Sequence, residues 1–167
     1  IILLSYAIVE ILFFIPLPVI GIHAWNESVY LSFIDYLLKR RDPCLFISSY
    51  DPYRPDYNVG YVFFWVSYAY MGLLSALYPP TYFTFHLYAR SFSLICTLIT
   101  SILLFSLLRS LLCDQEVALL ATCVYLLLPL TLYFGAKYQL EPFIFMLFVA
   151  SVFCLVRFFS SKRRVYL

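Results

Sequence analysis

The sequence predicts an all-α integral membrane protein, a polytopic helical bundle with an interfacial amphipathic helix in its first external loop. The 167 residues are 64% hydrophobic, 21% aromatic and only 12% charged, and the mean hydropathy is +0.91. Soluble domains are close to half apolar and a quarter charged. Apolar runs of roughly 20 residues, the length that crosses a bilayer, alternate with short polar segments. The net charge of +2 is too small to indicate a nucleic-acid partner.

The first apolar run lacks the basic start and the small-residue cleavage site of a signal peptide, so we interpret it as a membrane helix. Because the chain starts inside an apolar run and ends on a basic segment, we expect it to be the N-terminal membrane part of a longer protein. Its five cysteines have no CxxC spacing and are interpreted as small apolar residues.

Four apolar runs are predicted to cross the membrane, at about residues 1–22, 83–108, 117–134 and 142–159. Pro16 and Pro18 predict a kink near the end of the first run, and Pro129 lies inside the third. Pro142 opens the last run, at the position where a helix tolerates proline best. Glu141 then lies at the helix N-terminus, where a carboxylate suits the helix dipole.

Residues 23–58 are predicted to form the first external loop. Within it, residues 27–39 place Tyr30, Ile34 and Leu38 along one helical face, which predicts a short amphipathic helix on the membrane surface. The rest of the loop is rich in proline and turn-forming residues. The aromatic run 59–78 is rich in tyrosine and tryptophan, which favours an interfacial or re-entrant segment.

The charge distribution leaves two topologies open. If all five apolar runs span, nine of the eleven basic residues share one side. The positive-inside rule then places loop 23–58 in the cytoplasm, with Glu27 and Glu141 on opposite faces. If 59–78 does not span, the basic residues divide six to five, and Glu27 and Glu141 share one face.

Acidic side chains at membrane boundaries are the first candidates for chemistry, because a carboxylate is costly in a membrane. Glu27 and Glu141 each stand at a helix end, where they could share a divalent metal ion, bind a sugar hydroxyl or act as a general base. His23, one helical turn before Glu27, could join a metal site. Glu10, in the middle of the first run, is expected to face other helices.

Basic side chains near the same boundary are candidates for binding a phosphate group. Arg54, Arg90 and Lys137 fall on one side in the topology with four spans. The planar fork of arginine suits phosphate oxygens particularly well.

Four short motifs in this order resemble the N-terminal part of GT-C glycosyltransferases. They are WNESVY (25–30), YDPYRPDYN (50–58), ARS (89–91) and LEPF (140–143). The resemblance covers nearly the whole chain and is nearest to the dolichyl-phosphate-mannose protein mannosyltransferase and aminoarabinose transferase group. It implies transfer of a sugar from a polyprenyl-phosphate donor to a protein, lipid or glycan acceptor on the external or lumenal face. It also implies a multi-pass protein of the plasma membrane, or of the endoplasmic reticulum in a eukaryote.

The resemblance also implies roles for individual residues. Asn26-Glu27 falls on the acidic pair of the family's first external loop and Tyr30 on the tyrosine that follows. Asn26 departs from the usual aspartate, so Glu27 is the member of the pair that can ionise and act as base. Arg90 falls on an arginine opening a membrane helix, and Glu141 on the acidic residue that completes the site. The loop residues Arg54, Asp56, Tyr57 and Asn58 fall on the loop that contributes to the donor phosphate site.

Two alternatives stay open. One is a non-enzymatic polytopic membrane protein, such as a transporter part or an assembly subunit, in which all five apolar runs span. The other is a related GT-C enzyme with a different lipid-linked donor. A divalent metal ion, held by Glu141 together with Asn26, Glu27 or His23, is part of the enzyme hypothesis.

Overall fold

The computed structural model describes residues 1–14, 31, 34, 35, 38, 61–79, 81–135 and 137–165. Their regular secondary structure is entirely helical, which confirms the predicted all-α class for this part of the chain. The elements are α1 (Ile2–Val9), a π-helix η1 (Glu10–Phe14), α4 (Tyr61–Leu77), α5 (Tyr82–Leu112), α6 (Gln115–Leu127), α7 (Pro129–Phe134) and α8 (Glu141–Val165).

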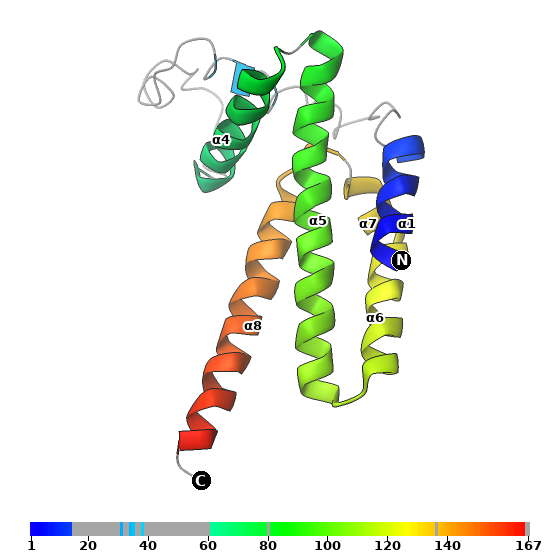
Figure 1. Cartoon of the computed structure of the whole chain (residues 1–167), viewed down its shortest axis with the longest axis vertical. Coiled ribbons are helices and arrows are strands. Elements are labelled where there is room, and N and C mark those ends of the chain that lie inside the picture. The colour runs from blue at the N-terminus through cyan, green and yellow to red at the C-terminus, as the bar shows by residue number, and fades with distance from the viewer. Residues whose placement is uncertain are drawn as a thin grey trace, which may run out of the picture.

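The long helix α5 is the central element of the bundle (Figure 1). It packs against both α6 and α8, and more lightly against α1 and α4. α8 runs in the same direction as α5, whereas α6 runs in the opposite direction (Figure 1). At 1.5 Å per residue, the 31 residues of α5 extend about 46 Å. Its first turns project past the start of α8, and α4 lies at that end (Figure 1).

The ends of α5 and the start of α6 are set by short local signals. Thr81 and Thr84 form a reciprocal capping box at the start of α5. At the other end Cys113 adopts a left-handed conformation with φ 56°, and the next residue, Asp114, caps α6. A left-handed residue directly after a helix reverses the chain sharply, which is why α6 returns along α5.

The apolar run 117–134, predicted as one span, forms two helices in the structure, α6 and α7. Leu128 leaves the helical region with ψ 134°, and Pro129 occupies the first turn of α7. A proline disfavours helical backbone in the residue before it, so the break falls at Leu128. The first predicted span is helical over its described part, with the π-turn beginning at Glu10, and residues 15–22 lie outside the described residues.

Two helices in the described part of the chain are long and apolar enough to cross a membrane, Thr84–Leu112 and Glu141–Ser160. Three more are apolar but shorter: Ile2–Leu12, Val62–Leu77 and Gln115–Leu127. Only 11% of the α8 window is buried inside the protein, compared with 44% for α5. An apolar helix so little covered by its own chain needs apolar surroundings, and this favours a membrane-associated protein.

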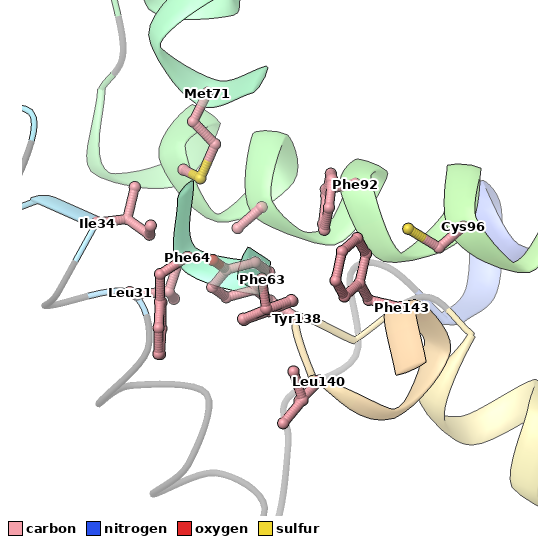
Figure 2. Packing of buried hydrophobic residues seen from close by; sticks show 11 residues of the cluster. Leu31, Ile34, Phe63, Phe64, Met71, Phe92, Cys96, Tyr138, Leu140 and Phe143 are labelled. Atoms are coloured by element: carbon pink, nitrogen blue, oxygen red, sulfur yellow. The ribbon is translucent and has the colours of Figure 1, made fainter. Parts of the chain in front are cut away.

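A cluster of buried apolar residues joins the aromatic helix α4 to α5 and to the start of α8 (Figure 2). Phe63 is at its centre, with ring centroids 5.3 Å from Tyr138, 5.8 Å from Phe143 and 5.9 Å from Phe92. Leu31 and Ile34, from the predicted surface helix, belong to the same cluster. Their apolar face therefore packs against protein, where the sequence predicted a membrane surface.

Candidate functional site

Three charged side chains are buried in the described part of the chain: Glu10, Arg90 and Lys137. Their exposed fractions are 0%, 9% and 1%. Burying a charge is costly unless partners compensate for it, so such residues are rarely incidental. Two of the three, Arg90 and Lys137, were predicted from the sequence as phosphate-binding cations, and the structure places both in the protein interior.

Arg90 and Glu141 lie at the same height in the bundle. Phe92 of α5 contacts Phe143 of α8, with ring centroids 6.0 Å apart. α5 and α8 run in the same direction (Figure 1). The Phe92–Phe143 contact therefore places Arg90 and Glu141, each two positions earlier in its helix, near one level of the bundle. Glu141 is exposed at the first turn of α8.

Lys137 lies at this same end, in the tight turn between α7 and α8. Its neighbour Tyr138 is buried in the cluster that contains Ala89 and Phe92, on either side of Arg90. The backbone N–H of Lys137 donates to Phe134 O at 3.2 Å, and that of Gly135 donates to Thr131 O at 2.7 Å.

Hydrogen bonds from two other helices hold the turn in place. Thr97 of α5 donates from Oγ1 to Gly135 O at 3.3 Å. The Tyr6 hydroxyl of α1 donates to Thr131 O at 3.3 Å. The buried lysine is thereby fixed relative to both α1 and α5.

Glu10 stands at the start of the π-helix η1, which packs against α7. Neither of its carboxylate oxygens meets the geometry of a hydrogen bond. Glu10 is fully buried, and the π-helix that it opens contacts α7. The prediction that Glu10 faces other helices is therefore confirmed.

Sequence reasoning did not predict that η1, which begins at Glu10, packs against α7, the helix that leads to Lys137. Its only sequence signal is the spacing of Tyr6 and Glu10, four residues apart on one helical face. Lys137 is 127 positions away from Glu10 and gave no signal.

The remaining predicted site residues lie outside the described residues. They are His23, Asn26, Glu27, Tyr30, Arg54, Asp56, Tyr57 and Asn58. Among the residues that the structure describes, no three histidine, cysteine or acidic side chains come together as a metal-binding group. A metal held by Glu141 and the first loop stays a prediction.

No family model, curated protein or solved structure matches the chain. Function is therefore inferred from the arrangement of its own residues.

Proposed function

We propose that this chain is the N-terminal membrane part of a glycosyltransferase that uses a polyprenyl-phosphate-linked sugar. The acceptor is a protein, lipid or glycan at the external or lumenal face of a multi-pass membrane protein. The observation that carries the proposal is the burial of two cations, Arg90 and Lys137, at one end of the bundle. Arginine and lysine side chains at such a boundary suit an anionic ligand such as a phosphate.

Helix lengths support placing this end of the bundle at a membrane surface. From Arg90 to Leu112, α5 extends about 34 Å, and from Glu141 to Ser160, α8 extends about 30 Å. Both lengths fit a hydrocarbon core of about 30 Å. If the far ends of the two helices share one surface, then Arg90 and Glu141 share the other. The aromatic helix α4 then lies in the headgroup region, which suits its tyrosines and Trp65.

The buried cluster supports a topology in which the first loop and the turn between α7 and α8 lie on the same side of the membrane. Leu31 and Ile34 from the first loop pack in one cluster with Tyr138 and Leu140 (Figure 2). A topology in which all five apolar runs span would put these two segments on opposite sides. The packing thus favours the arrangement in which Glu27 and Glu141 face one compartment.

In the proposed reaction, Arg54, Arg90 and Lys137 bind the donor phosphate. An acceptor hydroxyl or amide attacks the anomeric carbon, the bond from that carbon to the phosphate oxygen breaks, and polyprenyl phosphate leaves. Glu27 takes the acceptor's proton, a role that typically accelerates a reaction by about 10² to 10⁴. Glu141, Asn26 and His23 orient the acceptor, and Tyr30, Asp56, Tyr57 and Asn58 line the loop beside the donor.

The first prediction concerns the buried arginine. Arg90→Gln should raise the donor KM by about 10- to 100-fold, because a hydrogen bond to a charged group contributes about 1.5–3 kcal/mol. Arg90→Lys keeps the charge but loses the planar guanidinium, whose N–H groups can donate two parallel hydrogen bonds to a phosphate. It should therefore give an intermediate donor KM. The measurement is transfer of radiolabelled sugar from a polyprenyl-phosphate donor by the protein in lipid nanodiscs.

Arg109→Gln is the matched control, because Arg109 is exposed at the opposite end of the same helix. It should leave the donor KM at the wild-type value. Thermal unfolding of each variant separates loss of binding from loss of fold. A folded Arg90→Gln variant with the wild-type donor KM would show that Arg90 does not bind the phosphate. Because the 167 residues alone are not expected to be active, these assays use the full-length protein of which they form the N-terminal part. Absence of any transfer by that full-length wild-type protein would overturn the proposed function.

A further inference from the structure

The end of the bundle opposite to Arg90 and Glu141 carries five basic residues for which the proposed reaction has no use. Arg109 is in the last turn of α5, and Arg157 is in the second half of α8. The last turns of α8 carry the other three: Lys162, Arg163 and Arg164. Because α5 and α8 run in the same direction, their C-terminal parts lie at one end of the molecule (Figure 1).

The helix register places these basic residues in a narrow band. Phe92 of α5 contacts Phe143 of α8, which defines a common level. Arg109 comes 17 residues after Phe92, and Arg157 comes 14 residues after Phe143. At 1.5 Å per residue, Arg109 and Arg157 therefore lie within about 5 Å of one level, and Arg164 lies about 10 Å beyond Arg157. The band is close in depth to the headgroup layer of a bilayer, roughly 5–8 Å on each side of the hydrocarbon core.

The two arginines in this band are exposed and have no acidic partner. Arg109 and Arg157 form no ion pair with a carboxylate in the part of the chain that the structure describes. The guanidinium carbon of Arg157 instead lies 5.3 Å from the ring centre of Phe153, which supplies no negative charge. The acidic residues described at this end are Asp114 and Glu116, at the start of α6. Five basic residues against two acidic ones leave this end positively charged.

Exposed apolar side chains accompany the positive charge. Leu111 and Leu112 follow Arg109, and Phe158 and Phe159 follow Arg157, and all four are exposed. A phospholipid combines a headgroup phosphate with apolar acyl chains, so it can cover both kinds of side chain. A soluble anion would neutralise the arginines and leave the apolar side chains in water.

We propose that this end of the bundle binds anionic phospholipids, whose phosphates pair with Arg109, Arg157 and the basic residues that end α8. Arginine can donate two parallel hydrogen bonds to a phosphate. Basic segments beside membrane helices attract anionic lipids, by about fivefold in association constant for each basic residue near the surface. Both topologies considered for the chain place all five basic residues on one side of the membrane, so the inference holds in either one.

The second prediction is a preference of the protein for anionic lipids. The full-length protein is reconstituted in phosphatidylcholine vesicles that contain a trace of spin-labelled phosphatidylglycerol or spin-labelled phosphatidylcholine. Electron paramagnetic resonance measures the fraction of each labelled lipid that the protein immobilises. Wild type should prefer phosphatidylglycerol by about fivefold, as expected for one basic residue per lipid. Salt at about 0.5 M should reduce this preference, because it screens exposed charges.

Three variants make the test specific to this end. Arg109→Gln/Arg157→Gln should lower the preference to about twofold, and it keeps the three basic residues that end α8, which help to orient the protein. Arg109→Lys/Arg157→Lys keeps both charges and should retain most of the preference. Glu116→Gln is the matched control of opposite sign, because it neutralises an exposed carboxylate at the same end, and it should not lower the preference.

The inference is wrong if wild type immobilises the two labelled lipids equally, or if the variant with two glutamines keeps the full preference. If that variant does not fold, a wild-type preference that stays unchanged in about 0.5 M salt overturns the inference instead. Sugar transfer plays no part in these measurements, so they test the lipid site separately from the proposed function.

Discussion

Gly135 lies where α1, α5 and α7 come into close contact. A methyl group at this position would meet the Thr131 carbonyl oxygen and would lie 2.5 Å from the Tyr6 hydroxyl. The backbone conformation is not the reason for glycine here, because φ is −58°, which suits any residue. Glycine instead provides the space in which the Tyr6 hydroxyl reaches Thr131 O. Gly135 lies in the same turn as Lys137, two residues before it.

The third prediction follows from this lack of space. Gly135→Ala should destabilise the protein by about 1–3 kcal/mol, the usual cost of overpacking a tight site. The matched control is Gly72→Ala in α4, where the added methyl group would lie at an ordinary 3.6 Å from Leu38 Cδ2. Alanine in a helix interior should stabilise that position by about 0.5–1 kcal/mol.

Thermal unfolding tests whether Gly135→Ala lowers the Tm while Gly72→Ala raises it. Gly135→Ala should also weaken phosphate binding, because it displaces the turn that holds Lys137, whereas Gly72→Ala should not. Equal Tm values for the two alanine variants would contradict the proposed crowding at Gly135.

At the scale of elements, the reversal between α5 and α6 depends on two consecutive residues. Cys113 ends α5 in the left-handed conformation, and its N–H donates to Arg109 O at 3.2 Å. Asp114 then accepts hydrogen bonds from the backbone N–H groups of Glu116 at 2.8 Å and Val117 at 3.2 Å. This end of the hairpin is exposed, so little else holds it.

The fourth prediction is that Asp114→Ala destabilises the protein by about 1 kcal/mol, the typical contribution of a helix N-cap. Asp114→Asn should be nearly neutral, because asparagine caps a helix about as well as aspartate does. Thermal unfolding measures both changes, and hydrogen exchange at Glu116 and Val117 should become faster in the alanine variant alone. An alanine variant as stable as the asparagine variant would show that the cap contributes nothing.

For the whole molecule, the helical class and most helix positions could be predicted from the sequence. Runs of apolar residues extend over α5 and α8, and Glu141-Pro142 marks the start of α8 as expected. The division of the run 117–134 depended on how one proline acts on its neighbour. Pro129 indicates a disturbance of the helix, but hydropathy alone does not distinguish a kinked helix from two helices.

The candidate site was predictable only in part. Arg90 and Lys137 were identified as cations near one boundary, but hydropathy does not show whether a lysine in a turn is buried. The burial of Lys137 and that of Glu10 depend on contacts between residues far apart in the sequence. Such contacts arise from tertiary packing, which local pattern does not specify. The roles of Glu27 and Arg54 stay predictions, because both lie outside the described residues.

The arrangement of the bundle in a membrane separates the proposed enzyme from its non-enzymatic alternative. In the arrangement with four spans, Asp35 and Glu141 face one compartment and Gln115 faces the other. With all five apolar runs spanning, Asp35 and Glu141 face opposite compartments, and nine basic residues lie on the side of Asp35. The positive-inside rule favours the second arrangement. The packing of Leu31 and Ile34 with Tyr138 and Leu140 favours the first.

The fifth prediction decides between them by cysteine labelling. Single cysteines replace Asp35, Gln115 or Glu141 in a background whose five native cysteines are serine, and a membrane-impermeant maleimide is added to sealed vesicles of known orientation. Glu141 is preferred to Lys137 as a reporter because Glu141 is exposed and Lys137 is buried. Asp35→Cys and Glu141→Cys should be labelled from the same side, and Gln115→Cys from the other. Labelling of Asp35→Cys and Glu141→Cys from opposite sides would exclude a shared site for Glu27 and Glu141, because buried packing cannot join segments that a bilayer separates.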